Sequence, residues 1–107
     1  MQIEEWLPIK GFEGYYEVSN QGNVAKVTTS KRVLLKPYAN KNGYLRIKLT
    51  KDGKRKAFYI HRLVCHAFHP NPDNLPEVDH INRVRTRNWS DNLRWVTREE
   101  NLANREF

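Results

Sequence analysis

The first 60 residues consist of short apolar-rich segments separated by turn residues. The clearest turns are Asn20-Gln21-Gly22, residues 40–43 and Asp52-Gly53, because asparagine, aspartate and glycine favour tight turns. In residues 44–50 the side chains alternate between apolar and polar or basic, which is the period of a strand with one face on a core. The pattern predicts a small antiparallel sheet with one apolar and one basic side, formed by strands over 15–19, 23–28, 32–38, 44–50 and 54–60.

The periodicity changes after Ile60. A short helix over 61–70 is predicted because four apolar residues fall on one face and Pro70 ends it; they are Leu63, Val64, Ala67 and Phe68. The single cysteine, Cys65, is expected to be a small core residue, and it excludes an internal disulfide. His66 and His69 share a helical face, but Cys65 is the only cysteine or acidic residue near them. We therefore expect packing and capping, rather than zinc binding, from these two residues and His61.

The last third predicts a strand at 78–81, a loop, a strand at 93–97 and a terminal helix to about Arg105. Thr97 and Glu100 form a Thr-x-x-Glu capping box, which opens that helix. The predicted fold class is α+β: a small antiparallel sheet, then a helix, then a strand–loop–strand–helix unit. We expect residues 1–53 to form an N-terminal sheet module and residues 54–107 a second unit, with its strand–loop–strand–helix part at 77–105.

The charge is distributed unevenly. The chain has 19 Lys and Arg against 12 Asp and Glu, a net charge of +7. Residues 23–69 carry twelve basic groups against Asp52 alone, a net of +11, whereas residues 1–22 and 70–107 are slightly acidic. A block this basic is typical of proteins that bind a polyanion, most often nucleic acid, although a soluble domain of high pI would share it. No apolar run approaches the ~20 residues that cross a bilayer, and no leader is evident, so no membrane partner is expected.

Three residues of the C-terminal unit are candidates for one site. Asp79 and His80 end its first strand, and Asn101 lies in the first turns of its helix. In a hairpin with a helix folded across it, these side chains can face one another. The carboxylate of Asp79 and the amide oxygen of Asn101 suit Mg²⁺, which keeps several waters and takes few protein ligands. His80 can accept a proton from an attacking water near pH 7. The implied reaction is metal-assisted hydrolysis of a phosphodiester.

The stretch "VDHINRVRTRNWSDNLRWVTREENLANR" resembles the ββα-metal motif of HNH endonucleases, in the branch typical of phage and intron-encoded homing enzymes. His80, Asn92 and Asn101 match its three signature positions, with asparagine at the third, as that branch commonly shows. The resemblance implies that His80 is the general base, that Asp79 and Asn101 hold one divalent ion (Mg²⁺ or Mn²⁺), and that Asn92 braces the loop that orients His80. Where the family often has Asp-Gly or Asn-Gly after the histidine, this chain has Asn82-Arg83.

The N-terminal stretch "EEWLPIKGFEGYYEVSNQGNVAKV" is similar to a small modular DNA-binding domain that often precedes such nucleases. Together the two resemblances imply an HNH endonuclease that cuts double-stranded DNA as a monomer or weak homodimer. A cytoplasmic location in a bacterial host or phage-infected cell follows. One metal and one base predict a nick in one strand per monomer. The rival interpretations are a DNA-binding protein that uses the HNH unit only as scaffold, and an RNA-binding or RNA-cleaving module.

Contact with the DNA backbone is expected from basic residues of the sheet and of the loop after His80. Such contacts fix the register of a protein on DNA without reading its sequence. The predicted set is Arg46, Lys48, Lys51, Lys54, Arg55, Lys56, Arg83, Arg85 and Arg87.

Overall fold

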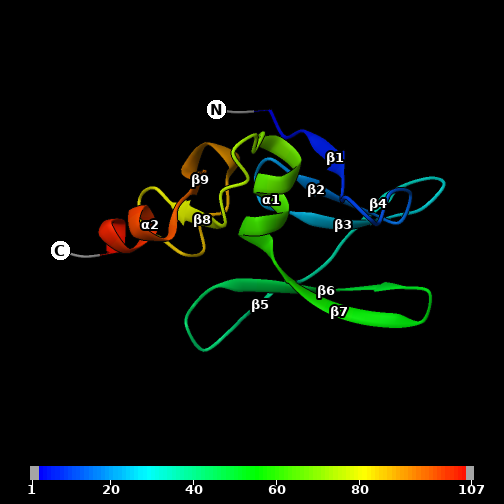
Figure 1. Cartoon of the computed structure of the whole chain (residues 1–107). Coiled ribbons are helices and arrows are strands. Elements are labelled where there is room, and N and C mark those ends of the chain that lie inside the picture. The colour runs from blue at the N-terminus through cyan, green and yellow to red at the C-terminus, as the bar shows by residue number, and fades with distance from the viewer. Residues whose placement is uncertain (1–2, 106–107) are drawn as a thin grey trace.

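Three antiparallel sheets follow one another along the chain in the computed structural model, which describes residues 3–105 (Figure 1). The first sheet contains, in order, β1 (Trp6–Pro8), β2 (Tyr16–Ser19), β3 (Val24–Val27) and β4 (Arg32–Leu34). The second contains β5 (Tyr38–Ala39), β6 (Leu45–Lys51) and β7 (Lys54–Tyr59). The third is the pair β8 (Glu77–His80) and β9 (Leu93–Val96).

Helices connect and cover these sheets. Helix α1 (Ile60–Phe68) follows β7 directly, and the 3₁₀ turn η1 (Ser90–Asn92) leads into β9. Helix α2 (Arg98–Arg105) folds back over the β8–β9 pair, which gives the predicted strand–loop–strand–helix unit (Figure 1). Within residues 3–105, neither helix is long and apolar enough to cross a membrane.

The α+β fold class is confirmed, but the expectation of a single N-terminal sheet is wrong. The predicted strand over 32–38 is interrupted between β4 and β5, where Pro37 has no amide hydrogen for a sheet ladder. The strands on either side of this break therefore belong to different sheets. Strand β1, which the sequence did not predict, extends the first sheet by pairing with β2. The division at residues 53 and 54 stays a prediction.

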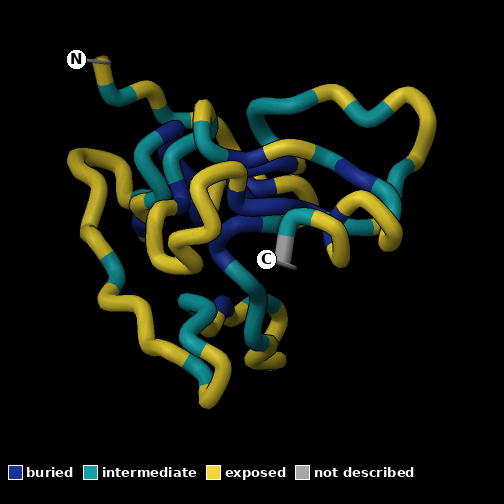
Figure 2. Tube along the Cα trace, turned by 90° about the vertical axis from the view of Figure 1, so that its left-hand side faces the viewer, coloured by how far each residue is buried: buried dark blue, intermediate teal, exposed yellow. Residues whose placement is uncertain are grey.

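The apolar face of α1 contributes to a core that includes residues of all three sheets. Val18 and Val24 come from the first sheet, Leu49 from the second and Val78 from the third, and all four pack in one cluster with Val64. The buried segments gather in the interior of the trace, and exposed loops surround them (Figure 2). Cys65 is fully buried in the same cluster, as predicted, and burial raises the pKa of its thiol to about 12. The N-terminal sheet and the C-terminal strand pair therefore share one core.

The basic residues of the β6–β7 hairpin divide between its two faces. Ile47 pairs with Phe58 in the core, and this register puts Lys56 and Lys54 on the face of Leu49. Arg46, Lys48 and Arg55 lie on the opposite face. The prediction that one side of the sheet is basic and the other apolar is therefore wrong for Lys54 and Lys56. The pairing of Ile47 with Phe58 in the core places these two lysines on the same side as the apolar residues. Lys51 donates to the carbonyl of Gly11 at 2.7 Å and is thus joined to the first sheet.

The predicted capping box at the start of α2 is confirmed. The backbone N–H of Glu100 donates to Thr97 Oγ1 at 3.1 Å, and the backbone N–H of Thr97 donates to Glu100 Oε1 at 2.9 Å. Hydrogen bonds from the backbone N–H and, to a lesser extent, the side chain of Thr97 lower the pKa of the Glu100 carboxyl. The two bonds of the capping box satisfy two amide donors that the helix itself leaves without partners.

We expect Thr97→Ala to lower the free energy of unfolding by about 1 kcal/mol, the usual cost of losing an N-terminal cap. Thr97→Ser keeps the hydroxyl and should retain most of that stability. Urea denaturation of both variants measures the difference. Equal losses in the two variants would contradict a role for the hydroxyl.

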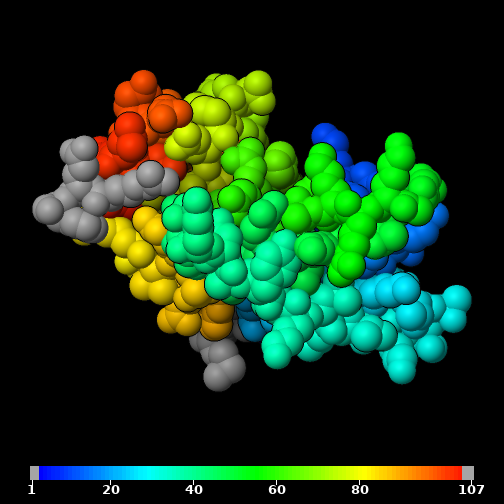
Figure 3. All heavy atoms as spheres, turned by 90° about the horizontal axis from the view of Figure 1, so that it is seen from below, coloured from blue at the N-terminus to red at the C-terminus, as the bar shows by residue number. Residues whose placement is uncertain are grey.

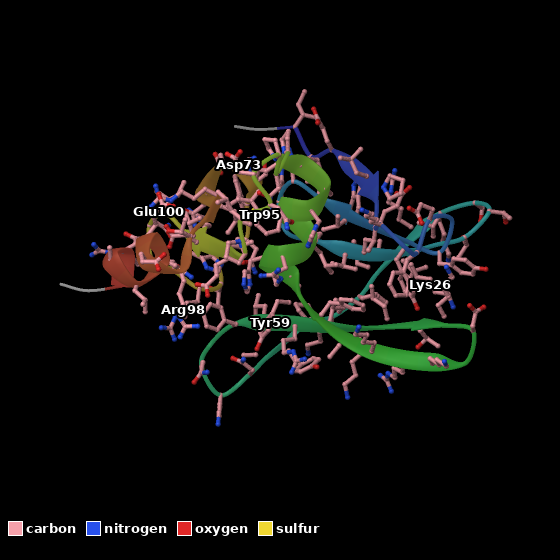
Figure 4. The ribbon with its side chains drawn as sticks, viewed as in Figure 1. Lys26, Tyr59, Asp73, Trp95, Arg98 and Glu100 are labelled. Atoms are coloured by element: carbon pink, nitrogen blue, oxygen red, sulfur yellow. The ribbon has the colours of Figure 1, made fainter. Side chains whose placement is uncertain are left out.

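The histidines of α1 make packing contacts. His66 meets the ring of Trp95 edge-on at 4.9 Å, and His69 Nε2 lies 2.6 Å from the carbonyl of Ser90. His61 is buried between Tyr44 and Tyr59, each with its ring centre 5.3 Å away. Tyr59 lies below the start of α1 and Trp95 lies beside the helix in the view of Figure 4. Burial, and to a lesser extent His80 and Arg62, lowers the pKa of His61 to about 3.

Because His61 is buried in its neutral form, we predict that the folded state loses stability in acid. Its pKa in an unfolded chain is about 6.5, so between that pH and 3 the unfolded state binds a proton that the folded state excludes. The stability that this residue confers is therefore complete above pH 6.5 and is lost as the pH falls towards 3.

His61→Phe keeps a ring at this position but has no proton to bind, so its free energy of unfolding should fall less steeply between pH 6.5 and 4.5 than that of the wild type. Denaturant titrations at several pH values measure both slopes. Parallel curves for the two proteins would show that His61 does not exclude the proton.

Candidate active site

Three of the four residues predicted for catalysis and metal binding lie together in a pocket of about 140 Å³ at the end of β8. Asp79 and His80 reach it from β8, and Asn101 reaches it from the second turn of α2. The remaining lining residues are Tyr44, Val78, Arg83, Arg85 and Asn104. The hairpin with a helix across it thus assembles residues that are 22 positions apart in the sequence. Asn92 does not line the pocket.

His80 is held by an asparagine that the sequence did not single out. Its Nε2 lies 2.7 Å from Oδ1 of Asn88, and both side chains are buried. An amide oxygen can only accept a hydrogen bond, so Nε2 carries the hydrogen and Nδ1 carries the lone pair of the neutral ring. Burial lowers the pKa of His80, while the bonds to Asn88 and the charge of Asp79 act in the opposite direction. The ring is therefore neutral near pH 7, with one nitrogen able to accept a proton.

Asn92 ties both ends of the loop between β8 and β9. Its backbone carbonyl accepts from the N–H of Ile81 at 2.8 Å, and its Oδ1 accepts from the N–H of Asn82 at 3.0 Å. Its Nδ2 donates to Oδ1 of Asn82 and to the carbonyl of Arg87, each at 2.9 Å. Asn92 therefore braces the loop that carries Asn88. Its effect on His80 is indirect, through that loop.

The carboxylate of Asp79 is buried, with its side chain 4% exposed. Nδ2 of Asn104 lies 2.9 Å from both carboxylate oxygens and 3.1 Å from the carbonyl of His80. The guanidinium of Arg94, on the neighbouring strand, donates to Oδ2 at 2.9 Å. Asn104 was not predicted, although its position three residues after Asn101 places both on one helix face and was a signal in the sequence.

Asn101 donates its Nδ2 to a carboxylate oxygen of Glu77 at 2.7 Å. The side chain of Asn101 is buried, and this bond leaves its Oδ1 as the atom for another partner. Residues 3–105 contain no group of three or more His, Cys, Asp and Glu side chains that could hold a metal ion. The oxygens of Asp79 and Asn101 fit a hard divalent cation that takes few protein ligands and completes its shell with water and substrate oxygens.

The loop arginines contact their own chain as well as the pocket. Arg85 donates to the carbonyl of Asn42 at 2.7 Å and stacks over Tyr44. Arg83 donates to Oδ1 of Asn104 at 3.3 Å, whereas Arg87 stacks over Trp89. The loop after β8 consequently lies beside the turn between β5 and β6 (Figure 3). Arg83 and Arg85 thus bring positive charge to the pocket that contains His80.

Two family models match the chain. Residues 4–50 match the NUMOD4 motif, and residues 58–103 match the HNH endonuclease model. The chain is 45% identical over 100 residues to the DNA endonuclease I-HmuI of Bacillus phage SP01, a match that covers 94% of this chain and 56% of that protein. It is 34% identical over 99 residues to the H-N-H endonuclease F-TflI of Escherichia phage T5, covering 90% of this chain and 49% of the relative.

The fold also matches a solved structure, which is described as DNA binding and cleavage by the HNH homing endonuclease I-HmuI. The TM-score is 0.83 at 45% sequence identity, over 94% of this chain and 57% of that one. The chain spans about half the length of these two relatives. The chain therefore contains an HNH endonuclease unit, matched over residues 58–103, with a NUMOD4 motif ahead of it at residues 4–50.

Proposed function

We propose that this chain hydrolyses phosphodiester bonds of double-stranded DNA with the help of one divalent cation, and that it nicks one strand per monomer. The observation that carries the proposal is His80, a buried neutral histidine whose Nδ1 is left to accept a proton, in the same pocket as Asp79 and Asn101. DNA binding and cleavage by the relative of similar fold support DNA as the substrate. Two phage relatives support action inside an infected bacterial cell.

In the proposed reaction His80 takes a proton from the attacking water at Nδ1, while Asn88 holds the hydrogen on Nε2. Asp79 and Asn101 are the residues that would hold the cation, Mg²⁺ or Mn²⁺. When bound, the cation stabilises the negative charge that develops on the phosphate and on the leaving oxygen. Asn104 and Arg94 fix the carboxylate of Asp79, and Glu77 fixes the amide of Asn101.

The basic residues supply the proposed DNA contacts. Arg46, Lys48 and Arg55 share one face of the β6–β7 hairpin, while Lys54 and Lys56 extend from the other face. Arg83 and Arg85 line the pocket and are suited to the phosphates nearest the cut. Arg87 and Lys51 remain in the proposed set, although each already contacts a ring or carbonyl of its own chain.

Relaxation of supercoiled plasmid tests the proposal. We expect wild-type protein to convert supercoiled DNA into open circles with Mg²⁺ and not with EDTA. His80→Ala should be slower by a factor of about 10² to 10⁴, the usual contribution of a general base. His66→Ala is the control, because that exposed histidine of α1 lies outside the pocket.

Direct conversion of supercoiled plasmid to linear molecules would leave the proposed hydrolysis in place. It would mean that two copies of the protein cut both strands together, rather than one copy nicking one strand. Plasmid that is bound but stays intact with Mg²⁺ and Mn²⁺ over a range of pH would overturn the proposed activity. A DNA-binding protein with an HNH scaffold would then take its place.

A further inference from the structure

A turn of the N-terminal module lies against the residue that orients His80. The carbonyl of Asn20 accepts a hydrogen bond of 2.7 Å from the N–H of Ser90, in the loop that precedes β9. Gly22, in the same turn, packs on Asn88 so closely that a Cβ atom added to this glycine would lie 2.9 Å from both Cβ and the carbonyl oxygen of Asn88. The NUMOD4 segment and the nuclease unit therefore meet at a contact with no room for one further carbon atom.

The turn is held firmly by its own module. Ser19 is fully buried, and its carbonyl accepts from the N–H of Gly22 at 3.0 Å. Asn20 is 8% exposed, and its side chain accepts from the N–H of Glu5 at 2.9 Å and donates to the carbonyl of Ile3 at 3.1 Å. The turn consequently presents a fixed surface to Asn88.

Asn88 has few bonds of its own. Its Nδ2 is buried without a hydrogen-bond partner among the described residues, and its Oδ1 accepts from His80. His80 and the Gly22 turn are thus two direct neighbours of Asn88, in addition to the bonds by which Asn92 braces its loop. Which ring nitrogen of His80 carries the hydrogen depends on the hydrogen bond that Asn88 accepts, and the Gly22 turn packs directly on Asn88.

We propose that the turn Ser19–Gly22 is a positioning element for His80: it holds Asn88 so that His80 keeps its hydrogen on Nε2 and its lone pair on Nδ1. This inference rests on the role of His80 as general base proposed above. The N-terminal module then takes part in the chemical step, beyond any contact that it makes with DNA. Gly22 and Asn20 act through Asn88 and are positioning residues.

Gly22→Ala tests the proposal, with Gly14→Ala as its matched control. Both glycines belong to the N-terminal module and have nearly the same left-handed backbone, with φ of +81° and +84°. An added Cβ at Gly14 meets nothing within 4 Å. The two variants therefore share the backbone strain of alanine at positive φ, and only the first displaces Asn88.

We expect Gly22→Ala to lower kcat for plasmid nicking by a factor on the order of 10 to 100, as small displacements of catalytic groups do. The DNA concentration for half-maximal rate should stay unchanged. The ¹⁵N spectrum of the His80 ring, recorded at pH 8 without metal or DNA, should show hydrogen moving from Nε2 to Nδ1. Gly14→Ala should leave both the rate and the spectrum as in the wild type.

Ser90→Pro tests the same contact from the loop, which matters if Gly22→Ala does not fold. It removes the amide hydrogen that Asn20 accepts, at the first position of η1, where proline suits the backbone. It should shift the His80 spectrum in the same direction. In an Asn88→Ala background, Gly22→Ala should cost no further kcat, because the path from the turn to His80 is already cut.

Equal rates and spectra for Gly22→Ala and Gly14→Ala would overturn the positioning role. So would a full further loss of kcat from Gly22→Ala in the Asn88→Ala background. Failure of the proposed function gives a different result: the wild-type protein leaves the plasmid intact, or His80→Ala nicks as fast as the wild type, whatever the His80 spectra of the glycine variants show.

Discussion

The burial of α1 is the constraint on which the rest of the structure depends. The apolar face of this nine-residue helix packs against strands of all three sheets, so that Val18, Leu49 and Val78 share one core with Val64. A chain of this length buries only about two thirds of the surface that its unfolded form exposes. Two separate cores would each be too small to be stable, whereas one shared core fixes the N-terminal module against the nuclease unit.

That shared core has consequences for the site. It sets the distance between the turn Ser19–Gly22 and the loop of Asn88, and thereby the position of the N-terminal module relative to His80. The buried polar groups around His80 are acceptable only where they find partners. Asn88, Asn104 and Glu77 provide those partners for His80, Asp79 and Asn101 respectively. His80 and Asn101 are thus each oriented by one bond to a second side chain, whereas Asp79 is held by both Asn104 and Arg94.

The sequence alone was sufficient to predict those site residues whose positions follow from local secondary structure. Strand alternation and the capping box placed Asp79, His80 and Asn101 at the ends of elements that meet, and the structure brings them into one pocket. Asn88 and Gly22 could not be found in this way. Their importance arises from a contact between segments that are 66 residues apart, and no local period encodes such a contact. The faces of Lys54 and Lys56 were missed for a related reason, since register depends on which residues enter the core.

Arg83 shows how the loop after His80 combines a backbone requirement with a charge. Its φ is +66°, in the left-handed region where a residue with a Cβ costs about 1 kcal/mol more than glycine. The bonds between Asn82 and Asn92 on one side and between Arg83 N–H and the carbonyl of His80 on the other fix this turn. Glycine would meet the backbone requirement at lower energy, as in the Asp-Gly and Asn-Gly loops of similar sequences. Arginine is less favourable than glycine in this backbone conformation, but it places a guanidinium in the pocket. That guanidinium donates to the side chain of Asn104, which also holds Asp79. The departure from glycine therefore adds positive charge to the pocket that contains Asp79 and His80.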